Sequence, residues 1–215
     1  MSVDMTARAL YVGVALVGGA CAGLVRAGQD EAGRVRIWKF AADAAGGAPS
    51  GFKTPVGSWI VESSPRGKLV VQHASNADPV FNVMLAEGVS ATDVDLSVNL
   101  RAVAGELDRG GGVVWRARDA KNYYVARYNP LEDNLRVYKV VDGVRSQHFQ
   151  DAAIVHDDRW YSLRVVMKGD HIEVYLDDKK YLDAHDDAFP GAGTVGLWTK
   201  SDARTKFENL TLRKP

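Results

Sequence analysis

The sequence predicts an all-β fold built as a two-sheet antiparallel sandwich. Short runs of alternating apolar and polar residues recur with a spacing of about 8–12 residues. Turn-forming pairs such as Asp142-Gly143 separate these runs. Outside the N-terminal segment, no amphipathic stretch exceeds about ten residues, the length that a helix prediction requires.

The sandwich is expected to begin with a strand at 35–40, whose Trp38 and Phe40 tie this end of the chain to the core. Residues 41–52, AADAAGGAPSGF, are small and glycine-rich, and they are expected to form a loop. The strand at 92–102 alternates cleanly and should bury one face against the core. Its inward residues are Val94, Leu96, Val98 and Leu100.

A β-meander is predicted from Gly110 onward, because three alternating runs follow one another with turn residues between them. Asp142-Gly143 is typical of a two-residue hairpin, and Gly169-Asp170 and Asp177-Asp178 join the next three strands. The predicted strands are 35–40, 57–62, 67–73, 80–86, 92–102, 111–118, 122–129, 134–141, 144–150, 160–168, 171–177, 179–184, 193–200 and 205–213.

The first 27 residues have the pattern of an export signal. A short polar start is followed by an apolar, small-residue run, and Val25-Arg26-Ala27 suits cleavage before Gly28. The sequence therefore predicts a signal peptide at 1–27, one domain at 28–215, and a periplasmic or secreted protein. A retained membrane anchor and a lipoprotein cut before Cys21 are the alternatives.

Charge and cysteine content exclude several classes of partner and site. The chain has 27 basic and 27 acidic side chains, and removing the leader leaves a net charge of about −1. Such a balance provides no field that would recruit nucleic acid or an anionic membrane. Cys21 is the only cysteine, so the mature domain has no disulfide and no thiolate metal site.

Four segments of the chain resemble a known group of proteins. These are GGVVWR at 111–116, NYYVARYNPLEDN at 122–134 with LRVYKVVDG after it, GTVGLWTKSD at 193–202, and FENL at 207–210. They are similar to exported bacterial jelly rolls of the concanavalin A-like lectin/glucanase superfamily, which includes laminin-G-like modules and proteins labelled 3-keto-disaccharide hydrolases. The resemblance covers 35–213 and implies a jelly-roll sandwich; it does not fix the activity, because the fold hosts both binders and enzymes.

One polar, arginine-rich sheet face is the candidate ligand site. Alternation on neighbouring strands brings polar side chains together there, and Trp198 beside Lys200 suggests a platform on which a sugar ring stacks. The candidate ligand-binding residues are Arg116, Arg127, Asn129, Asn134, Arg136, Trp198 and Lys200. The structural alternatives are that the asparagines form turns and that the arginines make cross-strand charge pairs.

Catalytic signals are weak. The E-x-D-x-x-E motif of laminarinase-type members of the superfamily is absent from the sequence. Asp93 and Asp95 share a strand face but are better explained as solvated side chains, and Glu132 remains the candidate acid/base. An Arg–carboxylate pair that locks the hairpin is an equally good explanation of Glu132.

Metal sites are also weakly indicated. The five histidines show no ligand spacing that predicts zinc, and the acidic loops at 156–158 and 183–187 are expected to be solvated. The resemblance implies a structural Ca²⁺ near the last strand, where Glu208 and Asn209 are the matching residues. No other cofactor is expected.

Three functions follow, in order of preference. The first is an exported module that binds a saccharide on its concave sheet. The second is a glycoside hydrolase that acts through Glu132. The third is a cell-envelope domain that binds another protein. The sequence leaves the oligomeric state open.

Overall fold

The structure is a computed structural model that describes residue 1 and residues 35–146, 150–154 and 158–215. Apart from Met1, the predicted signal peptide 1–27, with its alternatives of an anchor or a lipidated Cys21, lies outside the described residues. Among the residues described, no helix has the length and apolar character needed to cross a membrane.

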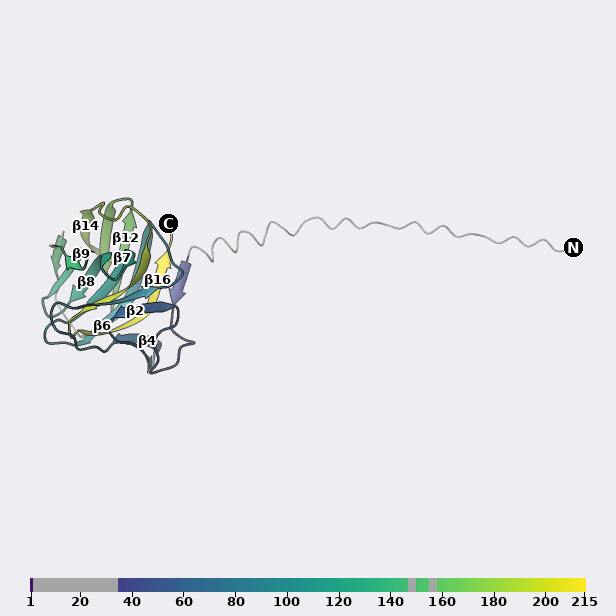
Figure 1. The fold of residues 1–215 in the computed structure, drawn as a ribbon, viewed down its shortest axis with the longest axis horizontal. Helices are drawn as coiled ribbons and strands as arrows, with labels where there is room; N and C mark the ends of the chain where they lie inside the picture. The colour runs from purple at the N-terminus through teal and green to yellow at the C-terminus, as the bar shows by residue number, and fades with distance from the viewer. Residues whose placement is uncertain (2–34, 147–149, 155–157) are drawn as a thin grey trace.

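Two eight-stranded antiparallel sheets form a sandwich (Figure 1). In sheet A the order is β14-β13-β12-β6-β16-β4-β3, with β1 paired to β16. Its strands are β1 (Val35–Trp38), β3 (Trp59–Ser64), β4 (Gly67–Gln72), β6 (Val94–Ala104), β12 (Tyr161–Lys168), β13 (His171–Leu176), β14 (Lys179–His185) and β16 (Arg204–Arg213).

In sheet B the order is β10-β9-β8-β7-β15-β5-β2, with β11 also paired to β9. Its strands are β2 (Phe52–Val56), β5 (Phe81–Ala86), β7 (Gly111–Asp119), β8 (Asn122–Asn129), β9 (Asn134–Val141), β10 (Val144–Arg145), β11 (Gln150–Ala153) and β15 (Thr194–Lys200). The prediction of an all-β, two-sheet antiparallel sandwich is confirmed.

The structure differs from the predicted strands in two places. Strand β2 begins at the end of the predicted loop 41–52; it carries a proline and pairs only with β5, as an edge strand tolerates. The predicted strand 144–150 is instead two short strands, β10 and β11, which pair with different halves of β9. The predicted hairpin turn at Asp142-Gly143 is confirmed, with both residues at positive φ.

The main core lies between the sheets. Trp115 stacks on Tyr124 with ring centroids 5.5 Å apart, and the four inward residues predicted for the strand at 92–102 are buried on β6. Trp38 belongs to this core as predicted, Trp59 lies in it as well, and Trp160 is only half-buried.

The face of sheet B turned away from sheet A has its own apolar layer. Nine buried residues form this second cluster: Val83, Leu85, Val114, Ala117, Tyr123, Val125, Tyr138, Val140 and Trp198. Arg145 of β10 lies over the rings of both Tyr138 and Phe81, which are on β9 and β5. The Arg145 side chain therefore reaches from the edge strand β10 across this outer face, and polar residues gather beside it.

Candidate functional site

The polar residues lie where strands β8 and β9 meet their connecting turn. In the register of these strands Arg127 pairs with Arg136, and Asn129 pairs with Asn134. Two like charges directly opposite each other are unfavourable. One carboxylate oxygen of Glu132, in the turn, resolves this repulsion by accepting from Arg127 Nη2 and Arg136 Nη1, each at 2.8 Å.

The two asparagines hold this turn in place. The Oδ1 atom of Asn129 accepts from the backbone N–H of Leu131 at 2.8 Å and of Glu132 at 3.1 Å, an Asx turn. The Nδ2 atom of Asn134 donates to the backbone oxygen and to Oε2 of Glu132, both at 3.1 Å. The Glu132 carboxylate is thus fixed by backbone and side-chain contacts, although its side chain is 41% exposed.

Three arginines surround Tyr138, and we call Arg127, Arg136, Arg145 and Tyr138 the arginine cluster. The guanidinium of Arg145 lies 4.4 Å from the tyrosine ring and that of Arg127 lies 5.7 Å away, distances typical of cation–π contacts. Arg127 also donates to the Tyr138 hydroxyl at 3.3 Å, and Arg136 pairs with Asp151 of β11 at 3.0 Å.

A second group of charges adjoins the cluster through Asn129. Its Nδ2 atom donates to buried Asp108 at 3.0 Å, and Asp108 lies 3.5 Å from Lys200 Nζ. Lys200 also pairs with Asp78. The Asp202 carboxylate accepts from the backbone N–H groups of residues 106–108, which fixes the loop that carries Asp108.

Several donors of the arginine cluster are buried without a hydrogen-bond partner in the described part of the chain. They are Nε and Nη1 of Arg127, Nε of Arg136 and Nη1 of Arg145. A buried polar group that lacks a partner costs about 1–3 kcal/mol. A cluster that leaves four such nitrogen atoms unsatisfied favours a molecule that supplies oxygen acceptors, such as hydroxyl groups.

Glu132 is held in its ionised form. Burial raises its pKa, but hydrogen bonds from Arg127 and Asn134, together with the charges of Arg127 and Arg136, outweigh that effect and lower the pKa from 4.5 to about 2. The carboxylate therefore remains an acceptor across the physiological range and cannot serve as a proton donor there.

Glu132→Gln is expected to remove a pH dependence of stability. The pKa of Glu132 is lower in the folded chain, so its stabilisation is complete above its unfolded pKa and is lost as pH falls from about 4.5 toward 2. The difference in unfolding free energy between wild type and variant should stay constant at about pH 5–7 and shrink below about pH 4.5. Urea denaturation at several pH values measures it; a difference that stays constant to about pH 3 would contradict the assignment.

The structure brings together six of the eight residues proposed for catalysis and ligand binding. Glu132 and the arginines 127 and 136 form direct ion pairs, the two asparagines hold the turn, and Lys200 joins through Asp108. Arg145 and Phe81 lie beside these residues in the structure but were missed by the sequence prediction. Arg145 follows the recognised hairpin turn, and Phe81 shares the alternation of β5 with buried Val83 and Leu85.

Arg116 does not belong to this site, which corrects the prediction. Its guanidinium is buried and donates to the backbone oxygens of Thr92 at 2.6 Å, Phe189 at 2.9 Å and Gly169 at 2.6 Å. The register shifts at a β-bulge after Trp115, and Arg116 itself has a φ of 46°. The bulge redirects the side chain, so Arg116 ties three loops together instead of facing a ligand.

Trp198 also differs from the prediction of a stacking platform. It lies on the expected face of β15, but it is fully buried there, and its Nε1 donates to the Tyr123 hydroxyl at 3.2 Å. Phe81 packs against its ring at a centroid distance of 5.6 Å and is only partly buried. Phe81 is therefore the aromatic side chain that this part of the outer face exposes.

The surroundings of Glu208 and Asn209 do not fit the structural Ca²⁺ that the resemblance implied. Buried Glu208 accepts from Arg66 at 2.6 Å and from Asn99 at 3.4 Å. A guanidinium already neutralises this carboxylate, and a nearby positive charge opposes cation binding. Asp93 and Asp95 are likewise structural, since Asp95 pairs with Arg164 at 2.7 Å and Asp93 accepts from the Gly169 N–H at 3.0 Å.

Fold and comparisons together define a jelly-roll sandwich of the concanavalin A-like class, as the resemblance implied. Within that class, the chain belongs to the family of 3-keto-alpha-glucoside-1,2-lyase-like domains, whose family model matches residues 43–213.

Three known proteins are similar to this chain. A levanase of Bacillus subtilis (strain 168) is 27% identical over 164 residues, which are 75% of this chain and 22% of the levanase. The carbohydrate binding module CBM66 from Bacillus subtilis is 26% identical with a TM-score of 0.66, covering 76% of this chain and 96% of the module. A putative glycosyl hydrolase from Parabacteroides distasonis ATCC 8503 shares the fold at 14% identity, with a TM-score of 0.56 and coverage of 84% and 100%. The chain thus spans about a fifth of the levanase that it matches.

Proposed function

We propose that this protein binds a saccharide on the outer face of sheet B, at the arginine cluster. The observation that carries the proposal is Arg127, whose side chain is 2% exposed and keeps two nitrogen atoms without partners among the described residues. Its hydrogen bonds to Glu132 and Tyr138 use Nη2 alone. A ligand that accepts hydrogen bonds gives those donors a role.

The chemistry around Arg127 suits vicinal hydroxyl groups. Each hydroxyl both accepts and donates, and the site offers guanidinium donors beside the ionised carboxylate of Glu132. Phe81 supplies an apolar surface next to Arg145, which suits the C–H face of a sugar ring. A positively charged ligand would be repelled by the arginines, and an apolar ligand would leave their donors unsatisfied.

A fructan is the saccharide to test first. The similarity to CBM66, a carbohydrate binding module, extends over nearly all of that module, and the levanase relative is named for its action on levan. The predicted export signal would place the site outside the cytoplasm, where such polymers are encountered.

Binding is better supported than cleavage. Glu132 is kept ionised between two arginines and so lacks a proton to donate. Burial raises the pKa of Asp108, against the charges of Arg127 and Lys200, but both of its carboxylate oxygens are already engaged, one by Asn129 Nδ2 and the other by Lys200 Nζ. A pair of carboxylates that both reach a substrate is therefore not formed by Glu132 and Asp108.

Isothermal titration with levan tests the proposal, and Arg136→Ala should weaken binding about 10- to 100-fold. This arginine is partly exposed and has a free Nε atom within the described structure; a hydrogen bond to a charged group contributes about 1.5–3 kcal/mol. Arg164→Ala is the matched control, because Arg164 also forms a carboxylate pair and lies over a tyrosine ring, but on sheet A. Its levan affinity should equal that of wild type.

Equal losses in both variants would place the effect in overall stability and contradict the site. Absence of binding to levan and to a panel of other oligosaccharides would overturn the proposal and favour the protein-interaction function. Release of reducing sugar that Glu132→Gln abolishes would instead establish the hydrolase alternative.

A further inference from the structure

We propose that His171, Asp183 and His185 form a binding site for a divalent transition-metal ion, with Zn²⁺ as the best match. The three residues lie on the hairpin β13–β14 at the edge of sheet A, in the opposite sheet from the arginine cluster. His171 and His185 are direct cross-strand partners, and Asp183 precedes His185 by two positions on the same strand. Alternation therefore places all three on one face of the hairpin.

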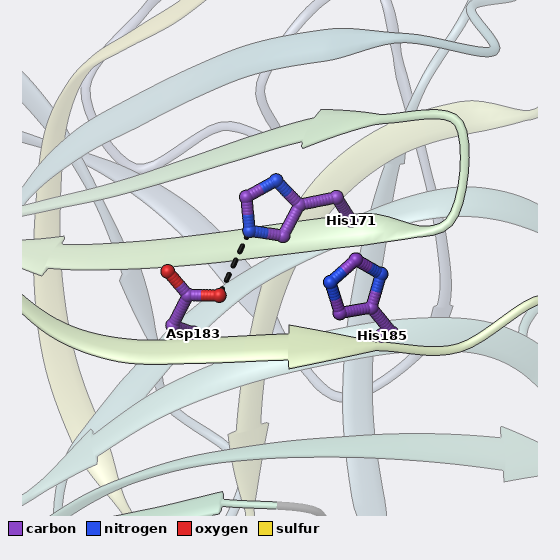
Figure 2. A group of neighbouring side chains, drawn as sticks. All are labelled: His171, Asp183 and His185. Carbon is purple, nitrogen blue, oxygen red and sulfur yellow. Dashed lines mark hydrogen bonds and ion pairs between the residues drawn. The ribbon is translucent and has the colours of Figure 1, made fainter.

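That face of the hairpin is the face of sheet A turned away from sheet B. Ile172, which follows His171, and its cross-strand partner Ala184, which lies between Asp183 and His185, are buried in the core. The side chains of the three candidate ligands are instead 40–63% exposed. Figure 2 shows both imidazoles and the carboxylate on the same side of the ribbon, with a ring nitrogen of each histidine turned toward Asp183. Two imidazoles and one carboxylate therefore converge from a paired, regular backbone.

The distances are close to those of a metal site. One ligand atom from each residue lies within 4.8 Å of the others, and His171 Nε2 is 2.8 Å from Asp183 Oδ1. Zinc bonds of about 2.0–2.2 Å in a tetrahedron place ligand atoms about 3.3 Å apart. Small side-chain rotations of these exposed groups bring them to that separation, with a fourth position left for water.

The surrounding groups orient the ligands. Nδ1 of His185 lies 3.3 Å from Asp170 Oδ2, which leaves Nε2 of this ring for a metal; such carboxylate–histidine contacts recur around zinc. Lys180 Nζ donates to the other oxygen of Asp183 at 2.8 Å and to Glu173 at 2.9 Å. Two carboxylates, those of Asp183 and Glu173, therefore share the single ammonium group of Lys180, and Asp170 adds a further negative charge beside His185. The excess of negative over positive charge in these contacts favours a cation.

The donor set selects the kind of metal. Imidazole nitrogen suits Zn²⁺, Cu²⁺ and Ni²⁺, whereas Ca²⁺ and Mg²⁺ prefer six or more oxygen ligands. The two imidazole rings already lie nearly parallel, with centroids 4.7 Å apart and an interplanar angle of 13°.

The test is isothermal titration of the metal-free chain with Zn²⁺ at about pH 7.5, followed by the same titration of His171→Ala/His185→Ala. We expect one ion bound per wild-type chain and at least a tenfold loss of affinity in the variant. His73→Ala is the matched control: His73 directly follows β4 of sheet A and is also paired with a carboxylate, that of Glu62, at 2.8 Å. This control should bind Zn²⁺ as wild type does.

A second readout tests whether misfolding of the double variant explains its loss of Zn²⁺ binding. Co²⁺ added to the wild-type chain should produce the visible absorption of a low-symmetry site and should fail to do so in the double variant. Levan titration should be equal in both proteins, because the arginine cluster lies on the other sheet. The proposal would be overturned if the wild-type chain did not bind Zn²⁺, or if the double variant bound it with the affinity of wild type.

Discussion

Replacing Arg116 by alanine is expected to lower the free energy of unfolding by about 3–5 kcal/mol. The guanidinium donates to three backbone oxygens on three separate loops, and Asp93 lies 3.6 Å away. Alanine would leave these carbonyls without their donor and would open a cavity where a large buried side chain had been. Urea denaturation of the purified variant measures the loss.

Two further variants separate the contributions of charge and geometry. Arg116→Lys retains the positive charge, but one ammonium group cannot reproduce the fork that reaches Thr92, Phe189 and Gly169, so most of the loss should remain. Arg118→Ala is the control: this exposed arginine on the same strand lies 5.1 Å from the Phe189 ring, and its removal should cost less than about 1 kcal/mol. A loss below about 1 kcal/mol for Arg116→Ala would refute its structural role.

Local pattern was sufficient to predict much of the candidate site. Alternation on β8 and β9, joined by a short turn, places Arg127, Arg136 and Glu132 on one face without any tertiary information. The asparagines at either end of the turn follow from their ability to bond local backbone. These residues are near one another in sequence, so the hairpin alone brings them together.

Arg116 was misplaced because alternation fails at a bulge. It shares the period of Val114, which belongs to the outer layer of sheet B, but the pairing with β8 shifts after Trp115. An extra residue in a strand reverses the side on which the following side chains project. No turn residue in the sequence marks that bulge.

Trp198 was placed on the correct face, but its exposure depended on distant strands. Tyr123 and Phe81 come from β8 and β5, and together they cover the indole. The sequence predicts which face a residue takes, whereas burial depends on what packs over that face. The histidine pair illustrates the same limit, because its 14-residue separation becomes a direct contact only through the register of β13 and β14.

Arg116 and Arg127 are both buried arginines, yet their donors differ. Nε and both Nη atoms of Arg116 donate to backbone oxygens. Arg127 uses Nη2 toward Glu132 and Tyr138, while its Nε and Nη1 lack partners within the described residues. In the described part of the chain, the fold therefore uses every nitrogen of the Arg116 guanidinium but only one of the three nitrogens of the Arg127 guanidinium.

Arg127→Met should therefore abolish levan binding with little effect on folding. Methionine keeps much of the length of the side chain and has no N–H group to leave unsatisfied, so the cost of the unused donors disappears with the contacts to Glu132 and Tyr138. Glu132 retains its bonds from Arg136 and Asn134. We expect the free energy of unfolding to change by less than about 1 kcal/mol and levan affinity to fall at least about 100-fold.

Calorimetric titration and urea denaturation of the same preparation give both quantities. Arg164→Met is the control, because Arg164 combines a carboxylate pair with a contact to the Tyr175 ring on sheet A, and its levan affinity should remain that of wild type. A stability loss in Arg127→Met as large as that of Arg116→Ala would make Arg127 a structural residue. Unchanged levan affinity would show that the arginine cluster is not the binding site. A loss of affinity without a loss of stability is expected only if the unused donors of Arg127 bind a ligand.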